Sequence, residues 1–325
     1  MRALRPALLA LLIVLLLALP VLSEALRQPA AIGLATQVLI YAIAAMSLNL
    51  ILGYGGMISF GHAAFFGIGG YVTGILYSHF AEHSAFLGLV PGTNDMLIVL
   101  PLAMLISGLM AAIIGAFCLR TNGVQFIMIT LAFAQMLFFL FVSLKTYGGD
   151  DGLMMRRRDV LPFLDTRNDT NFYLVCLTLA GLWLAVTRGV VRSKFGLVLG
   201  GLRQNEQRME AIGIAPYPYK LVAFIIAGMG AGLAGALMAN YLRFVSPGMM
   251  NWTRSGDLMM MVILGGVGTL MGPLLGAAAF VILESWLTTL TENWQFPLGL
   301  LLLALVLFTN GGLAGLLDRL WGRTR

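Results

Sequence analysis

The chain has 325 residues, of which 59% are hydrophobic and 10% are charged, and its mean hydropathy is +0.91. A soluble domain carries roughly 25% charged residues because its surface must be solvated, so this composition excludes a water-soluble protein. Glycine is frequent, with 39 residues, as expected where membrane helices pack closely. We therefore expect an all-α polytopic membrane protein with about 8–10 transmembrane helices, some glycine-broken or re-entrant, in one domain over residues 1–325.

The apolar runs begin close to the first residue. Arg2 and Arg5 precede an apolar stretch at residues 7–22, and a second apolar run begins near Ala31. This arrangement favours an uncleaved first membrane helix over a cleaved signal peptide, which remains the alternative. The runs predict ten spans. They lie near residues 7–23, 31–52, 62–79, 96–119, 123–144, 172–190, 220–241, 257–270, 273–291 and 296–316. Residues 257–291 are too many for one crossing and few for two, so we expect a short or re-entrant first half.

The charges between these spans predict the orientation of the chain. With the N-terminus in the cytoplasm, twelve basic and three acidic residues lie inside, against eight basic and ten acidic residues outside. Basic residues are enriched on the cytoplasmic side of membrane proteins. We therefore expect both termini to be cytoplasmic and the protein to lie in the bacterial inner membrane. The balanced outer segment at residues 145–171 is expected to form a folded periplasmic loop, either as a solvated surface or as a docking surface for a soluble partner.

Common enzyme motifs are missing from the sequence. It contains no GxSxG, HExxH or GxxxxGK[ST] pattern, and the dipeptide Gly-Lys never occurs. Without a phosphate-cradling loop, the chain is not expected to hydrolyse ATP by P-loop chemistry. The three histidines His62, His79 and His83 lack metal-ligand spacing, and Cys118 and Cys176 lie in apolar runs. We therefore expect no catalytic residue, no metal and no cofactor.

Two glycine-broken stretches interrupt the apolar sequence, at residues 53–62 and 265–273, and each follows an Ile-Leu pair. Unwound backbone at membrane depth is tolerated where it is buried in protein or lines a wet cavity. Matching breaks in two halves of a chain are typical of a transporter's substrate path, although glycines that merely allow close helix packing are the alternative. The predicted path residues are Gly53, Gly55, Gly56, Ser59, Gly61, His62, Thr130, Gly265, Gly266, Gly268, Gly272 and Pro273. Asn49, Gln135 and Glu284 are further polar residues inside spans, suited to interhelical hydrogen bonds or to a solute.

The cytoplasmic loop at residues 192–219 contains a predicted amphipathic helix at residues 198–212. Arg203 and Glu206 are spaced i,i+3, which supports one short helix, and Gly213 is expected to end it. Such a helix either lies on the membrane surface or contacts a cytoplasmic motor subunit.

These residues together resemble a known family, the LivM-type permeases of branched-chain amino acid ABC importers (the LivH/LivM family). The resemblance covers most of residues 40–285 in order. Its segments are 49–56 (NLILGYGG), 59–67 (SFGHAAFFG), 121–124 (TNGV), 130–135 (TLAFAQ), 148–153 (GGDDGL), 202–206 (LRQNE), 211–214 (AIGI), 232–237 (GLAGAL), 246–248 (SPG) and 264–273 (LGGVGTLMGP).

The resemblance implies a transmembrane permease domain that works with a second homologous permease subunit, two cytoplasmic ABC ATPase subunits and a periplasmic solute-binding protein. It makes the loop at residues 192–219 the ATPase-coupling loop. The implied coupling residues are Arg203, Glu206, Arg208, Glu210, Ala211 and Gly213. Ile212 departs from the Glu-Ala-Ala-Gly pattern of the wider importer class, so only the role of the helix is carried over.

Several alternatives stay open at this point. Relatives in this family move branched-chain amino acids but also urea and short amides, so the sequence leaves the solute unassigned. A stand-alone channel or ion-coupled carrier is the rival function, and the scarcity of intramembrane acids speaks against it. A purely structural scaffold leaves the paired glycine breaks unexplained.

Overall fold

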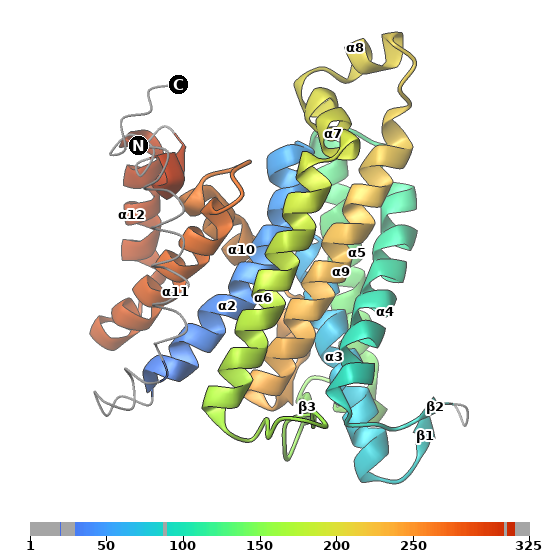
Figure 1. Ribbon diagram of the computed structural model, residues 1–325, viewed down its shortest axis with the longest axis vertical. Coiled ribbons are helices and arrows are strands. Elements are labelled where there is room, and N and C mark those ends of the chain that lie inside the picture. Colours follow the sequence, from blue (N-terminus) through green and yellow to red (C-terminus); the bar gives the residue numbers. More distant parts are fainter. Residues whose placement is uncertain (1–19, 21–29, 87–89, 309–310, 316–325) are drawn as a thin grey trace.

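The computed structural model describes residue 20 and residues 30–86, 90–308 and 311–315. It is an all-α bundle, as the composition predicts (Figure 1). The helices are α2 (Ala30–Asn49), α3 (His62–Ala81), α4 (Met96–Cys118), α5 (Val124–Ser143), α6 (Asp169–Arg192), α7 (Lys194–Gln204), α8 (Glu206–Ala211), α9 (Pro216–Leu242), α10 (Trp252–Gly265), α11 (Gly272–Leu290) and α12 (Gln295–Phe308). The short elements are a π-helical turn η1 (Leu50–Tyr54), the 3-10 turns η2 (Lys145–Tyr147) and η3 (Pro247–Met250), and the strands β1 (Ala85–Phe86), β2 (Val90–Pro91), β3 (Leu153–Met154) and β4 (Phe244–Val245). The predicted first span at residues 7–23 lies outside the described residues, apart from Pro20.

Six described helices are long and apolar enough to cross a bilayer: α2 with η1, α4, α5, α6, α9 and α11. Several begin at capping residues that the sequence supplies. The Asp95 carboxylate accepts a hydrogen bond from the Leu97 amide at 3.0 Å, and the Asn168 side chain accepts one from the Thr170 amide at 3.0 Å. Helix α3 has 20 residues but is less apolar than these six helices. Most of its residues are buried among the other helices.

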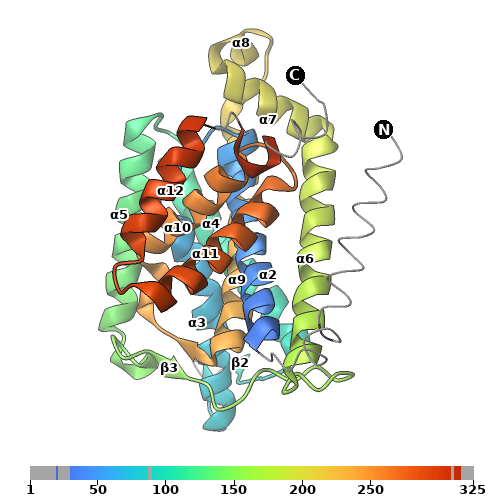
Figure 2. The same ribbon diagram turned by 90° about the vertical axis from the view of Figure 1, so that its left-hand side faces the viewer.

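Helix α9 lies at the centre of the bundle and packs against α2, α3 and α4. Small residues allow the close approach, because the Gly235 α-carbon faces the Phe66 carbonyl without room for a side chain. Ser107 of α4 donates a hydrogen bond to the Phe65 carbonyl of α3 at 3.2 Å, which ties α4 to α3. Helices α10, α11 and α12 form a second group beside α2 (Figure 2).

The chain between α9 and α11 is not one continuous helix. After α9, strand β4 pairs with β3, and η3 then packs against α3, where Met250 fills the space beside Gly67. Helix α10 begins only at Trp252 and has 14 residues, about 21 Å at 1.5 Å per residue. The predicted span at 257–270 is therefore misplaced, because α10 starts five residues earlier and ends at Gly265. Extended chain, η3 and this short helix together connect α9 to α11.

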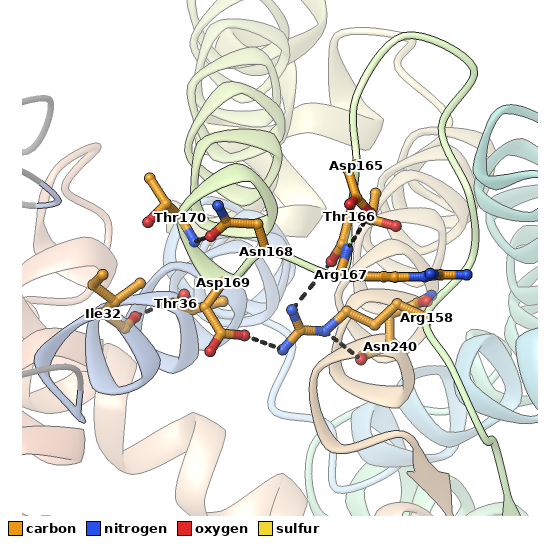
Figure 3. A network of polar contacts seen from close by, with 10 residues as sticks. All are labelled: Ile32, Thr36, Arg158, Asp165, Thr166, Arg167, Asn168, Asp169, Thr170 and Asn240. Carbon is orange, nitrogen blue, oxygen red and sulfur yellow. Dashed lines mark hydrogen bonds and ion pairs between the residues drawn. The ribbon is translucent and has the colours of Figure 1, made fainter.

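The two ends of the bundle differ. Helices α7 and α8 project beyond the long helices at one end, hereafter the α7–α8 end, and the short strands lie at the other, the β3–β4 end (Figure 1). At the β3–β4 end, the guanidinium of Arg158 fixes the segment after β3 (Figure 3). It donates to the carbonyls of Asn240 and Thr166 at 3.3 and 3.2 Å and pairs with Asp169 at 2.7 Å. It also lies 4.5 Å from the centre of the Phe172 ring.

Candidate functional site

The two glycine-broken stretches meet at the α7–α8 end of the bundle. Asn49, the last residue of α2, lies four residues before the first stretch and binds the second with both polar atoms of its side-chain amide. Its Nδ2 donates to the Thr269 carbonyl at 2.9 Å, and its Oδ1 accepts from the Gly268 amide at 2.9 Å. These bonds satisfy backbone groups of a non-helical turn that has few other partners. Asn49 therefore ties the end of α2 to the turn between α10 and α11, hereafter the α10–α11 turn (residues 266–271).

Glycine is required at the contact itself. A β-carbon on Gly53 would lie 2.6 Å from the Gly268 amide nitrogen, and Gly268 adopts a φ of +77°. Within the α10–α11 turn, the Thr269 hydroxyl donates to the Gly266 carbonyl at 2.8 Å and accepts from the Gly272 amide at 3.1 Å. Pro273 then occupies the first turn of α11, where its missing N–H costs nothing. The sequence thus specifies a rigid turn placed directly on the end of α2.

Arg203 of α7 reaches the same place from the projecting segment. Its Nη1 donates to the Gly53 carbonyl. The same nitrogen lies close to Gly268. The aliphatic part of the Arg203 side chain covers Gly56, which adopts a φ of +68°. One cation therefore touches both glycine-broken stretches and connects them to α7.

The predicted single helix at residues 198–212 is wrong, because the structure divides it into α7 and α8 at Asn205. Asn205 has extended backbone angles of −160° and 104°, and its side chain accepts a hydrogen bond from the Arg208 amide at 2.9 Å, which caps α8. Arg203 and Glu206 therefore do not share a helix, and Glu206 instead pairs with Lys220 of α9 at 2.7 Å. Gly213 follows α8 with a φ of +88°, as the predicted stop requires.

The remaining coupling residues lie on an open surface. The structure buries no residue of α8, and Arg208, Glu210 and Ala211 are exposed. Ile212 next to them is also exposed, at 67%.

A cavity of about 550 Å³ lies beneath this segment. Residues of four regions line it: the stretch after η1, the turn between α4 and α5 with the start of α5, α7 with α8, and the start of α9. The lining includes Gly55, Gly56, Asn122, Phe126, Arg203, Glu206, Glu210 and Lys220. Arg203 thus has contacts on one side and open space on the other.

The other predicted path residues form a second group, separate from the Asn49 contact. His62 is fully buried at the start of α3, and its Nε2 lies 3.0 Å from the Ser47 hydroxyl. Because that hydroxyl donates to the Ala44 carbonyl at 2.7 Å, it accepts from a protonated Nε2. The His62 Nδ1 then has no hydrogen-bond partner among the described residues.

Ser59, Gly61 and Thr130 complete this second group. The Ser59 hydroxyl accepts from the Gly61 amide at 3.2 Å, and Gly61 packs against the Thr130 backbone. Thr130 itself donates to the Ile127 carbonyl of its own helix at 2.9 Å.

Three residues in these contacts escape the sequence reasoning. Ser255 of α10 accepts from the Ala63 amide at 2.9 Å, across 192 positions of sequence. Ser47 and Lys220 likewise carry no local signal beyond a polar residue in an apolar helix. Asn49 is likewise only a polar residue in an apolar helix. Its position four residues before Gly53 is the one feature of the sequence that connects it with the first glycine-broken stretch.

A comparison of the sequence with models of known protein families finds one match. Residues 30–309 fit the model of the branched-chain amino acid transport system / permease component family. The chain belongs to this family. It is a multi-pass membrane permease of the ABC transport type, and the resemblance seen in the sequence is confirmed.

Several curated proteins are similar over most of the chain. The high-affinity branched-chain amino acid transport system permease protein LivM of Salmonella typhimurium is 28% identical over 87% of this chain and 69% of that protein. A probable branched-chain amino acid transport permease protein LivM of Methanocaldococcus jannaschii is 25% identical over 80% of this chain and 82% of that protein. The autoinducer 2 import system permease protein LsrC of Klebsiella pneumoniae is 32% identical over 45% of this chain and 43% of that protein. No solved structure matches the chain.

Proposed function

We propose that this permease carries branched-chain amino acids across the bacterial inner membrane as part of an ABC importer. Its partners in the proposal are a second homologous permease subunit, two cytoplasmic ATPase subunits and a periplasmic solute-binding protein. The family description and the printed names of the LivM relatives support the solute class. The sequence contains no P-loop of its own, which supports a separate source of ATP hydrolysis. Urea and short amides are the competing solutes.

The α7–α8 end is cytoplasmic in this proposal, and both termini are cytoplasmic. The residues at 192–219 then form the coupling loop, and residues 145–171 form a periplasmic loop. The supporting observation is the charge distribution, since the turn between α4 and α5 and the helices α7 and α8 carry basic residues at the same end.

The contact between Arg203 and Gly53 carries the mechanistic part of the proposal. A motor subunit that binds the exposed α8 moves α7, because the two helices are joined at Asn205. Arg203 transmits that movement to the Gly53 carbonyl and to the α10–α11 turn. The turn and the end of α2 then separate and open the path at the α7–α8 end. The surface that contacts the motor subunit, and the residues that hold it in place, are Glu206, Arg208, Glu210, Ala211 and Gly213.

The test is reconstitution of the permease with every protein that co-purifies from native membranes. We expect ATP-dependent uptake of leucine that unlabelled isoleucine and valine inhibit and that urea and acetamide do not. Arg203→Gln should uncouple the importer, with ATP hydrolysis retained and uptake lowered about tenfold, since a hydrogen bond from a charged group is lost. Arg188→Gln is the matched control, because Arg188 is exposed at the same end of α6. Leucine flux by the purified chain alone, without ATPases, would contradict the proposal.

A further inference from the structure

The cavity beneath α7 and α8 contains more polar groups than the contact between Arg203 and Gly53 uses. Its volume of about 550 Å³ lies within the range of about 300–1,000 Å³ that is typical of small-molecule sites. Four ionisable side chains line it, and they come from α7, α8 and α9: Arg203, Glu206, Glu210 and Lys220. We call it the α7–α8 cavity.

Two of these four side chains neutralise each other. The Lys220 Nζ lies 2.7 Å from the Glu206 Oε2, and the Lys220 side chain is only 10% exposed. Arg203 and Glu210 form no ion pair among the described residues. The one partner of the Arg203 guanidinium there is the neutral carbonyl of Gly53, so its charge is not compensated. The wall of the α7–α8 cavity therefore presents one free cation and one free carboxylate.

Helix α8 turns Glu210 toward this space. Glu206, Gln207 and Glu210 all line the α7–α8 cavity, and successive residues of a helix are about 100° apart, so these three share one side of α8. Arg208 falls on the opposite side and is not part of the lining. Helix α8 is held in this orientation against α7, because Met209 packs on Gly201, where an added β-carbon would lie 2.8 Å from the Met209 Sδ.

The rest of the wall is apolar where α4 and α5 meet it. Leu119, Phe126 and Ile127 line the α7–α8 cavity on this side. Helix α5 also begins here at Gly123, and no side chain caps its first amides. The start of a helix carries partial positive charge, which adds to the attraction of Arg203 for a negative group. The cavity thus combines an apolar wall, a positive region and one free carboxylate.

We propose that the α7–α8 cavity is a cytoplasmic binding site for the amino acid that the permease carries. Arg203 binds the carboxylate of the amino acid through the N–H groups that Gly53 does not use, and Glu210 accepts hydrogen bonds from its ammonium group. The aliphatic side chain of the amino acid lies against Phe126 and Ile127. This inference rests on the proposed function and adds to it a site that the solute reaches only after transport.

The charges of the cavity select a zwitterion over other small molecules. A nucleotide or phosphate carries only negative charge and would meet the Glu210 carboxylate. Urea and amides carry no charge, so they form no charge-assisted hydrogen bond with either Arg203 or Glu210. An α-amino acid pairs with both side chains at once.

Binding in this cavity also affects the movement in the proposed function. The contact between Arg203 and the Gly53 carbonyl is present in the structure that contains the cavity. A ligand shifts a protein toward the conformation that it binds more tightly. An amino acid on Arg203 therefore stabilises the arrangement in which α7 holds Gly53. Amino acid that accumulates in the cytoplasm should slow further import.

The test uses proteoliposomes that contain the complete importer. ATP is enclosed in the lumen, so only complexes with their ATPases inside are active, and radiolabelled leucine with the solute-binding protein is added outside. The lumen is preloaded with unlabelled leucine, with leucinamide, which lacks the carboxylate, or with 2-hydroxyisocaproate, which lacks the ammonium group. Luminal leucine should lower the initial rate of uptake about fivefold, which is a modest coupling between two sites. Either analogue should need a concentration about threefold higher or more for the same effect, since each loses one ionic contact.

The variants assign each group of the ligand to one residue. Glu210→Gln should remove the preference for leucine over 2-hydroxyisocaproate and keep the preference over leucinamide. Each rate is divided by the rate of the same variant without preloading, so a change in basal uptake cancels. Arg203→Gln has little uptake in the proposed function, so its binding of leucine is measured by calorimetry on the purified complex without the solute-binding protein. It should lose the preference over leucinamide. Glu292→Gln and Arg192→Gln are the matched controls, because both residues are exposed and lie outside the cavity lining.

The outcomes separate this inference from the proposed function. A wild-type importer that takes up leucine at the same rate with and without luminal leucine overturns the inference and leaves the proposed function standing. Unchanged discrimination between leucine and 2-hydroxyisocaproate in Glu210→Gln also overturns it. Absence of ATP-dependent leucine uptake by the wild-type importer, with an empty lumen, rejects the proposed function itself.

Discussion

Asp159 offers a test of the structure at the β3–β4 end, outside the spanning helices. Its carboxylate is fully buried in the segment that follows β3. Its Oδ2 accepts a hydrogen bond from the Asn240 side chain at 2.9 Å, and its Oδ1 has no partner among the described residues. Arg158 next to it points to other groups. The pKa of Asp159 is raised from its ordinary 3.8 to about 7, chiefly because the carboxyl is buried; the Asn240 hydrogen bond opposes this rise and the nearby Asp95 adds to it.

A raised pKa makes the folded protein less stable as pH rises. Between pH 3.8 and about 7 the folded state holds a proton at Asp159 that the unfolded state has released. The free energy of unfolding therefore falls through this window. The full difference between the two pKa values corresponds to about 4 kcal/mol, of which about 2 kcal/mol falls between about pH 5.5 and about pH 8.5.

Asp159→Asn should remove this contribution, because an amide cannot ionise and its oxygen can still accept from Asn240. The measurement is thermal unfolding of the detergent-purified protein at both pH values. The wild-type protein should lose more stability than the variant on going to the higher pH. Asp151→Asn is the control, since Asp151 is exposed in the same loop. Parallel pH profiles for wild type and Asp159→Asn would refute the assignment of Asp159 as a buried acid.

Three further substitutions test the contacts at the α7–α8 end and the packing of α9. Asn49→Ala should cost about 2–4 kcal/mol in thermal unfolding, because it leaves a backbone donor and a backbone acceptor of the α10–α11 turn unpaired. Gly235→Ala should cost about 1–3 kcal/mol in the same assay, since the added methyl group meets the Phe66 carbonyl, and wild-type stability would contradict the close approach of α3 and α9. Glu206→Gln should lower the unfolding temperature more than Glu210→Gln, because it leaves the largely buried Lys220 without its carboxylate.

The sequence marks both halves of the glycine contact, because each half has its own local signal, but it does not predict that the two halves touch. Gly53 and Gly268 lie in stretches that cannot continue as regular helix, and Asn49 directly precedes one of them. The bond between Ser255 and the Ala63 amide has no such signal. This bond depends on where the segment between β4 and α10 places the start of α10. The periodicity of apolar residues in the sequence does not indicate that position.

The start of α10 shows a second limit of sequence reasoning. A hydropathy window detects continuous apolar helices, and it places the span here at 257–270. Arg254 and Asp257 then count as exterior residues. In the structure, extended residues and η3 carry the chain along the bundle, so that α10 begins at Trp252, five residues before the predicted span. Backbone that is not helical inside a membrane protein is tolerated because neighbouring helices bury it, and hydropathy alone does not reveal this burial.

Helix α10 links the movement at the α7–α8 end in the proposed function to the start of α3. One end of it carries the α10–α11 turn, which Asn49 and Arg203 contact, and its first turn carries Ser255, which accepts a hydrogen bond from the Ala63 amide. A helix of 14 residues moves as a rigid body when its hydrogen bonds stay intact, so a displacement of the turn also displaces Ser255 relative to α3. Release of the turn by Arg203 would therefore loosen the start of α3 in the same movement, a coupling that a channel without a motor would not require.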